Sequence, residues 1–283
     1  MGDSDIDLTG GFKYLFSVLG GRAQVSKRGA LLKDEKAEEI IDGLALGSKH
    51  LKTGMLRAIF LGIRASVFDR LVDAYIDAHP DCVVLHLGCG LDSRVLRVKR
   101  SPRMWYDIDF PEVIGLRRKF FSESETNRMI GADVADLSWL EQVEGGGEAL
   151  IIAEAFTMFL TFDENRALIA ALRDKFNNAE YNFDAYSHKI VPGAADIGGK
   201  LPRGRAIRFG IQSPKQFEEI RGAKYAGYHD FYWSSNVMSL GLPAALLYKI
   251  FLGRPRTNRY YRIYKYQLFC HLSGDQMEMR SPS

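Results

Sequence analysis

The sequence contains few cysteines, no long hydrophobic run and almost no excess of charge of either sign. Three cysteines without a Cys-x-x-Cys pair argue against a disulfide framework or a zinc site, and favour a reducing compartment. No stretch reaches the roughly 18 uninterrupted apolar residues that a membrane span needs, and the acidic first residues lack the pattern of a signal peptide. We therefore expect a cytoplasmic protein without a membrane span and without a metal.

The charge balance of 38 basic and 35 acidic residues gives a net charge of +3, which requires no polyanionic partner. With 46% hydrophobic and 26% charged residues, the composition is that of a globular protein and excludes a disordered chain. A chain of 283 residues has room for one large α/β domain or two small ones.

The apolar pattern changes near residue 80 from helical to strand-like. Before this point, acids at 34–39 indicate a helix start, and apolar residues recur at helical spacing over 64–78. After it, short apolar runs predict strands near 82–87, 104–108, 128–132, 149–153, 180–186 and 260–272. We expect helices near 112–121, 163–176 and 213–220, the last because it begins with a Ser-Pro-Lys-Gln capping box. This alternation predicts a parallel sheet covered by helices on both faces.

One structural domain is the simplest organisation of these elements. Residues 1–80 are expected to form an N-terminal helical cap, and residues 81–283 a Rossmann-like domain. Within the latter we expect a late insertion, about 187–255, that acts as a lid over the substrate. Its first part, 187–210, is rich in glycine, proline and basic residues, which is typical of a long loop.

The most informative motif is the run Leu87-Gly88-Cys89-Gly90, in which a predicted strand enters a Gly-x-Gly turn. Glycine allows a sharp turn and lets a ligand approach without a Cβ atom in the way. Ser93 stands where a dinucleotide fingerprint has its third glycine, which disfavours NAD and FAD. The motif favours S-adenosylmethionine, a nucleoside cofactor without a pyrophosphate, and a plain tight turn is the alternative.

An acidic pair follows about 20 residues later, where a ribose-binding carboxylate is expected at the end of the next strand. Asp107 and Asp109 are the candidates, and Asp109 is better placed at the strand end. Either carboxylate could instead cap the helix that is predicted to begin near Glu112.

Together with Asp133-Val134-Ala135-Asp136-Leu137 and Ile152-Ala153-Glu154-Ala155, these motifs resemble the leucine carboxyl methyltransferase family. The resemblance is to its bacterial and archaeal branch, which includes polyketide O-methyltransferases of the tetracenomycin type. It implies a class I methyltransferase fold, a doubly wound seven-stranded sheet, with S-adenosylmethionine at the carboxyl ends of the strands.

The resemblance also implies roles for single residues. The loop Gly88-Cys89-Gly90 would border the methionine part of the cofactor, Asp109 would bind the ribose, and Asp136 and Leu137 would contact the adenine. Three further charged residues would bind the amino-acid end of the cofactor. Glu154 would face its amino group, Arg64 would bind its carboxylate, and Arg22 stands where a second N-terminal cation is expected. The alternatives are a solvated Arg64 and, for the neighbouring Arg94, a simple ion pair with Asp92 or another acid.

Two positions depart from the family pattern. Ala155 replaces a glycine that is common after the glutamate, and Phe159 stands where the family often has tyrosine. If that hydroxyl holds a substrate carboxylate, its absence argues against the leucine terminus of a protein phosphatase as substrate. Phe159 is expected either at the substrate or in the core.

The methyl acceptor is not determined by the sequence. A carboxylate needs no general base, whereas a phenol or alcohol would benefit from one. His188 is the candidate base, with a surface histidine as the alternative, and Arg203, Arg205 and Arg208 could attract an acidic substrate or form a solvated loop. We expect an S-adenosylmethionine-dependent O-methyltransferase acting on a carboxylate or hydroxyl of a small molecule or of a peptide C-terminus.

Two readings from other classes stay open, although we do not expect a nucleic-acid partner. A non-catalytic domain could keep the fold and bind a partner. An RNA-binding protein or RNA methyltransferase would use basic residues interleaved with tyrosines, since basic and aromatic side chains can follow phosphates and stack on bases. The residues of that pattern are Arg254, Arg256, Arg259, Tyr260, Tyr261, Arg262, Tyr264, Lys265 and Tyr266.

Overall fold

The computed structural model describes residues 10–29, 31–44, 53–194, 206–229, 241–242, 245–246, 248 and 260–270. Three helices precede the first strand: α1 (Gly10–Ser26), α2 (Glu35–Gly43) and α3 (Met55–Ala78). Asp34 caps α2 by accepting a hydrogen bond of 3.0 Å from the N–H of Ala37. The predicted helix over 64–78 is confirmed as the later part of α3. Most of the residues of α3 between Ala58 and Phe68 are buried.

Seven strands form a single sheet in the order β3-β2-β1-β4-β5-β7-β6. Strands β1 to β5 are parallel in their pairings, and β7 runs antiparallel to both β5 and β6. This arrangement confirms the doubly wound seven-stranded sheet of the class I methyltransferase fold. The strands are β1 (Val83–Leu87), β2 (Met104–Asp109), β3 (Asn127–Gly131), β4 (Glu148–Ala153), β5 (Asn178–Tyr186), β6 (Ala223–His229) and β7 (Tyr261–Phe269).

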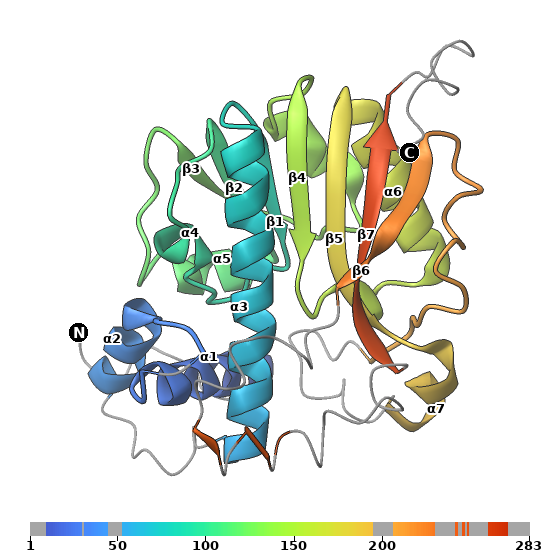
Figure 1. Ribbon diagram of the computed structural model, residues 1–283. Helices are drawn as coiled ribbons and strands as arrows, with labels where there is room; N and C mark the ends of the chain where they lie inside the picture. The colour runs from blue at the N-terminus through green and yellow to red at the C-terminus, as the bar shows by residue number, and fades with distance from the viewer. Residues whose placement is uncertain are drawn as a thin grey trace.

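Helices cover both faces of the sheet, with α3 on one face and α6 (Phe162–Lys175) on the other (Figure 1). Alternate residues of a strand pack against the helices on opposite faces of the sheet, because successive side chains of a strand point to opposite faces. Val84 and Ile152 pack in the same core as α3, whereas Leu85 and Ile151 pack in the core that contains α6. The alternation explains why the central strands read as unbroken apolar runs in the sequence.

The short helices lie between the strands. They are α4 (Arg94–Arg97), α5 (Pro111–Arg117), η2 (Leu137–Gln142), η3 (Thr157–Phe159), η4 (His188–Ile190) and α7 (Val191–Ala194). The helix that follows the glycine turn, α4, has only four residues. The strand β4 points toward the end of the sheet where α1 and α2 lie, so the carboxyl ends of the parallel strands face this pair of helices (Figure 1).

The helix predicted over 213–220 is wrong, because this segment consists of consecutive turns. Part of its capping box does form: the Gln216 side chain accepts a hydrogen bond of 3.4 Å from the Ser213 N–H. Phe217 and Ile220 insert into the sheet core, and the chain enters β6 at Ala223, only three residues after Ile220. The strand β6 was not predicted, and it lies inside the range 187–255 that was expected to be a lid insertion.

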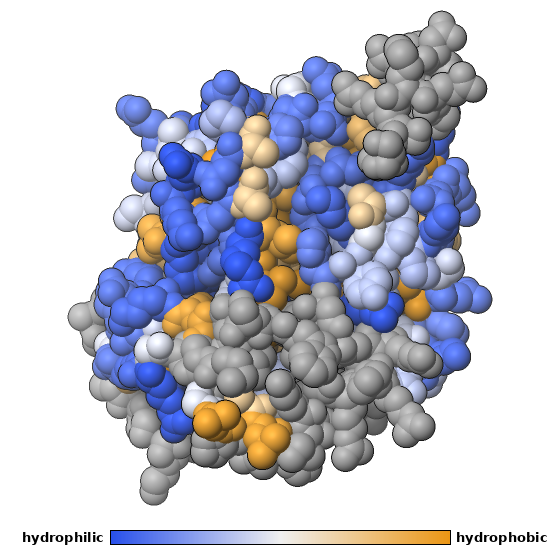
Figure 2. Space-filling view, viewed as in Figure 1, coloured by the Kyte–Doolittle hydropathy of each residue, from blue (hydrophilic) through white to orange (hydrophobic). Residues whose placement is uncertain are grey.

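Polar residues cover most of the upper part of the face shown in Figure 2, with a band of apolar residues beside α3. Within the described ranges, no helix is both long enough and apolar enough to cross a membrane.

Candidate cofactor site

The glycine turn after β1 folds back on the end of β2. The N–H groups of Gly88 and Cys89 donate to the Ile108 carbonyl at 2.8 and 3.2 Å, and both glycines have a left-handed backbone, with φ of +64° at Gly88 and +51° at Gly90. A Cβ atom on Gly88 would lie 2.4 Å from the Phe156 ring. The space beside Gly88 is therefore filled by Phe156, whereas a Cβ on Gly90 would meet only Leu15, at 3.3 Å.

Asp109 stands at the end of β2 and faces this turn. Its two carboxylate oxygens accept hydrogen bonds from the N–H groups of Gly90 at 2.8 Å and Phe110 at 2.7 Å. Burial raises the pKa of Asp109 to about 6, against the opposing effect of these two N–H donors. Each carboxylate oxygen has a second lone pair, so Asp109 can still accept hydrogen bonds from a ligand.

Asp107, the other acid of the pair, serves the core instead. It is fully buried and bonds to His86 Nδ1 at 3.1 Å, Trp105 Nε1 at 2.9 Å and Arg117 Nη2 at 2.7 Å. Burial alone would raise the pKa of Asp107, but Arg117 and His86 outweigh it and lower the pKa. The partners of Asp107 are buried side chains, whereas Asp109 accepts a hydrogen bond from Gly90 of the turn itself, and this separates the two candidates.

Glu154 follows β4 and is held between two arginines. Arg64 Nε donates to Oε1 at 2.8 Å and Arg94 Nη2 donates to Oε2 at 2.5 Å. Burial opposes ionisation, but the two guanidinium groups outweigh it and lower the pKa of Glu154 to about 2. Glu154 is therefore a buried carboxylate with a permanent negative charge at neutral pH.

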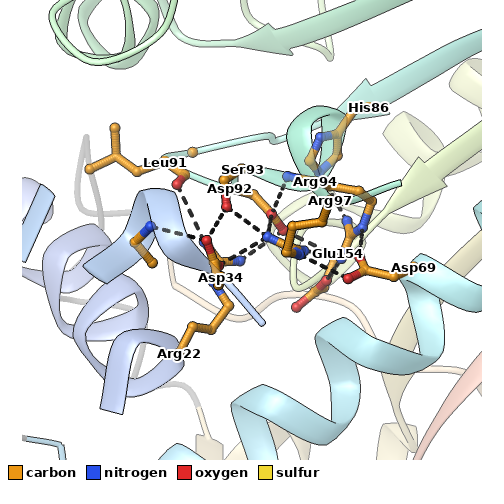
Figure 3. Close-up of polar contacts among 12 residues, drawn as sticks. Arg22, Asp34, Asp69, His86, Leu91, Asp92, Ser93, Arg94, Arg97 and Glu154 are labelled. Atoms are coloured by element: carbon orange, nitrogen blue, oxygen red, sulfur yellow. Dashed lines mark hydrogen bonds and ion pairs between the residues drawn. The ribbon is translucent and has the colours of Figure 1, made fainter. Parts of the chain in front are cut away.

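These side chains belong to a larger ion-pair network that joins the N-terminal helices to the sheet (Figure 3). Arg22 of α1 pairs with Asp92 at 2.8 Å, and Arg94 pairs with Asp69 of α3 at 2.7 Å. Arg97 of α4 contacts acids from three segments: Asp34 at 3.0 Å, Asp69 at 2.8 Å and Asp92 at 2.9 Å. Asp34, Asp69 and Arg97 were not predicted as site residues, because most of their partners lie far away in the chain.

A cavity opens between α1, the glycine turn and the ends of β2 and β4. It brings together eight of the predicted site residues, namely Arg22, Arg64, Gly88, Cys89, Gly90, Asp109, Glu154 and Phe159. The rest of its lining was not predicted and is mainly apolar: Tyr14, Leu15, Val18, His86, Leu91, Asp92, Phe110, Val113, Ala155 and Phe156. The helical pattern of the first residues was the signal that could have indicated Leu15 and Val18.

The predicted adenine residues lie outside this lining. Asp136 is exposed and caps η2 by accepting a hydrogen bond of 3.2 Å from the Ser138 N–H. Leu137 is half-buried and packs against the α6-side core. The segment that leads to them begins beside the cavity, because the Asp109 carbonyl accepts a hydrogen bond of 2.8 Å from the Ala132 N–H at the end of β3.

His188 and Arg208 also lie outside it. His188 is exposed, its backbone N–H donates to the Ile211 carbonyl at 3.0 Å, and the residue lines a separate cavity together with Arg208. Arg208 donates to the Phe159 carbonyl at 2.9 Å. The other two arginines predicted to attract the substrate, Arg203 and Arg205, fall outside the described residues.

The basic and aromatic pattern near the C-terminus is explained by β7. Tyr264 and Tyr266 are buried in the core, Lys265 pairs with Glu180 at 2.5 Å, and Arg262 lies 4.0 Å from the Tyr228 ring centre. These basic and aromatic side chains of β7 therefore contact other residues of the same chain. Arg254, Arg256 and Arg259 lie outside the described residues.

The donor set of the cavity fits S-adenosylmethionine. The amino-acid end of this cofactor carries one carboxylate and one ammonium group, and the cavity offers buried arginines beside a buried, ionised glutamate. Arg22 Nε is buried and makes no hydrogen bond, with Asp34 Oδ2 at 3.4 Å as its ion-pair partner, and Arg64 Nη2 makes no hydrogen bond to any described residue. Within the described part of the chain, no three His, Cys, Asp or Glu side chains are placed to hold a metal ion.

The sequence model of leucine carboxyl methyltransferases matches residues 21–173, which is more than half of the chain. The chain belongs to the leucine carboxyl methyltransferase family. This confirms the resemblance, and with it the activity and the cofactor that the motifs predicted: the protein is an S-adenosylmethionine-dependent O-methyltransferase. The family match contains every predicted cofactor residue, from Arg22 to Glu154.

Two relatives support the assignment. The tetracenomycin polyketide synthesis O-methyltransferase TcmP of Streptomyces glaucescens is 33% identical over 220 residues, which cover 77% of this chain and 81% of that protein. The S-adenosyl-L-methionine-dependent methyltransferase dpfgK of Gibberella zeae is 28% identical over 201 residues, or 64% of this chain and 67% of that protein. A Thermobifida fusca YX crystal structure assigned as a methyltransferase has a TM-score of 0.51 at 16% identity, covers 88% of this chain and 94% of that one, and shows the same fold.

Proposed function

We propose that this protein methylates a carboxylate of a small, aromatic, polyketide-like acceptor. The observation that carries the proposal is that Arg64, Asp109 and Glu154 meet in one cavity whose remaining wall is mainly apolar and aromatic. The substrate class named for the 33% identical relative, a polyketide, agrees with such a wall.

Bound S-adenosylmethionine would supply a methyl group on its positively charged sulfur. Asp109 is proposed to accept hydrogen bonds from the ribose hydroxyls, since it presents ionised oxygens at the end of β2. Glu154 would pair with the ammonium group and Arg64 with the carboxylate, and Arg22 would add a second cation. The turn Gly88-Cys89-Gly90 would border the same end, and Asp136 and Leu137 the adenine.

Aromatic side chains would bind the acceptor. Tyr14, Phe156 and Phe159 line the cavity, and their rings offer flat apolar surfaces to a fused-ring molecule. Arg57 is exposed and lies 5.6 Å from the Tyr14 ring centre, and none of the described carboxylates pairs with it. A cation at this place favours an acidic acceptor.

A carboxylate acceptor also agrees with the absence of a free base among the described lining residues. The only histidine in the lining is His86, which is buried between Asp107 and Arg94. Burial lowers the pKa of His86, so this ring is neutral and both of its nitrogens are engaged. An ionised carboxylate needs no proton removed, and the protein would act by orienting it and excluding water.

The helical cap of residues 1–80 and the segment 187–255, apart from β6, are proposed to enclose the acceptor. Tyr14 of the cap lines the cavity, and Arg57 lies beside its ring, which supports this proposal for the cap. Phe159 lines the cavity without a hydroxyl group, and this favours a flat aromatic acid over a peptide C-terminus.

Methyl transfer from labelled S-adenosylmethionine to a panel of polycyclic aromatic acids, and to the matching phenols without a carboxyl group, tests the proposal. We expect label in the acids, released by mild base as an ester would release it. Transfer to the phenols alone, giving a base-stable ether, would contradict a carboxylate acceptor. Calorimetry should also show micromolar binding of S-adenosylmethionine, and its absence would remove the basis for any transfer.

A further inference from the structure

We propose that Asp184 and Tyr261 are positioning residues for the cofactor, because together they hold the Arg64 guanidinium in the orientation that the cavity needs. The proposal rests on the proposed role of Arg64 at the amino-acid end of the cofactor. Both residues lie outside the part of the chain that matches the family model, which ends at residue 173.

The guanidinium of Arg64 is fixed on two of its three nitrogens. Nε donates to Glu154 at 2.8 Å, and Nη1 donates to the Tyr261 hydroxyl at 3.1 Å and lies 3.6 Å from Asp184 Oδ2. The group also stacks near the Phe60 ring, at 5.6 Å from its centre. Because Nε and Nη1 are occupied, Nη2 is the nitrogen left to bind a carboxylate in the cavity.

Asp184 acts on both sides of this site. Its Oδ2 accepts a hydrogen bond from the Tyr261 hydroxyl, and its Oδ1 accepts one of 2.6 Å from the N–H of Ala155, the residue that follows Glu154. One buried carboxylate thus contacts two elements of the site. It positions Arg64 through Tyr261, and it also binds the backbone next to Glu154. The two groups proposed to bind the carboxylate and the ammonium of the cofactor are therefore held at a fixed separation by the same side chain.

The sheet fixes Asp184 and Tyr261 in turn. Tyr261 is paired with Tyr186 across β5 and β7, and the two rings lie 4.5 Å apart. Tyr261 also packs against Phe60 of α3, with ring centres 5.8 Å apart. Tyr261 is only 4% exposed, so its hydroxyl cannot rotate into solvent without displacing the Phe60 and Tyr186 rings.

The test compares two ligands that differ only at the amino-acid end. S-adenosylhomocysteine carries the carboxylate and the ammonium group, whereas 5′-methylthioadenosine keeps the nucleoside and lacks both. Calorimetry at pH 8, where Asp184 is ionised, should show that Tyr261→Phe binds S-adenosylhomocysteine roughly tenfold more weakly than the wild type, the effect of one hydrogen bond to a charged group. Affinity for 5′-methylthioadenosine should stay unchanged.

Tyr264→Phe is the matched control. Tyr264 lies on the same strand, is equally buried, and packs in the core on the opposite face of the sheet. It should leave the ratio of the two affinities at the wild-type value. Asp184→Asn, a second variant of nearly the same shape, should lower S-adenosylhomocysteine affinity by more than tenfold, because it acts on both sides of the site.

Equal losses for both ligands in Tyr261→Phe would show a general structural effect and overturn the proposal, as would an unchanged ratio in both Tyr261→Phe and Asp184→Asn. If the wild-type protein bound neither ligand, the proposed cofactor roles themselves would be refuted. The wild-type measurement alone distinguishes this result from the two results for the variants.

Discussion

Replacing Arg94 by methionine removes the most deeply buried cation of the ion-pair network while keeping most of its apolar bulk. Arg94 is 0% exposed and contacts three carboxylates: Glu154 at 2.5 Å, Asp69 at 2.7 Å and Asp92 at 3.3 Å. Burial by itself would lower the pKa of Arg94, but these acids outweigh it and raise the pKa, so the side chain is always charged. Arg94→Met therefore leaves a buried excess of negative charge.

The cost of this change follows from what each acid retains. Glu154 keeps Arg64, Asp69 keeps Arg97 and Asp92 keeps Arg22 and Arg97, so no carboxylate loses its last partner. Removing one partner from a buried ion pair costs about 3 to 5 kcal/mol. With roughly 2 to 4 °C of midpoint shift for each kcal/mol in a chain of this size, we expect Tm to fall by about 10 °C.

Thermal unfolding followed by far-UV circular dichroism at pH 7 measures the effect, and Arg166→Met is the matched control. Arg166 also pairs with a carboxylate, Glu219 at 2.9 Å, but the two side chains are 56% and 51% exposed. An exposed pair contributes less than about 1 kcal/mol, so the control should move Tm by only 1 or 2 °C or so. An Arg94→Met protein as stable as Arg166→Met would refute the network as a source of stability.

Three further predictions concern the cofactor cavity. Asp109→Asn should weaken S-adenosylhomocysteine binding tenfold or more by calorimetry, since it removes a charged acceptor; affinity at the wild-type level would exclude the ribose role. Ala155→Gly should raise the free energy of unfolding in urea by about 0.5 to 1 kcal/mol, because Ala155 has a left-handed backbone with φ of +53°, and a loss of stability would contradict that conformation. Glu154, with its pKa lowered to about 2 from an ordinary 4.5, binds fewer protons folded than unfolded, so its ion pairs stabilise the protein above pH 4.5 and this stability is lost as the pH falls toward 2. Tm measured from pH 6 to 3 should show this loss of stability in the wild type and a smaller one in Glu154→Gln. Asp109 and Asp184 have pKa values raised to about 6, so their protonation adds stability as the pH falls from about 6 to 4.

The parallel strands could be predicted because local sequence alone determines them. Runs such as 82–85 and 149–153 are apolar at every position, and this is typical of a strand buried on both faces. The edge strand β6 gave no such signal: its residues alternate between exposed and half-buried, and Gly227 coincides with a break in its register with β7. A strand of that composition resembles a loop until its neighbour is known.

The glycine turn and the acid at the end of β2 could be predicted because both lie in one strand–turn–strand unit with fixed spacing. The partners of Arg94 and Arg97 could not, since Asp34 and Asp69 lie on helices that precede the sheet and their packing angle decides which acid meets which arginine. For the same reason Phe156 was not expected beside Gly88, because only the turn of the chain at Ala155 places the ring there.

The place of β7 in the sheet has a consequence for synthesis of the chain. β7 is the last of the seven strands to be made, yet it lies between β5 and β6 and carries Tyr261. The outer edge of β5 stays unpaired until residue 269 has left the ribosome. At 5 to 20 residues per second, this delay is on the order of ten seconds. Throughout that interval the outer edge of a nine-residue strand is open to pairing with other nascent chains. We expect chaperones that shield such edges to determine the yield of active protein, and any chain cut short before β7 to be unable to bind its cofactor.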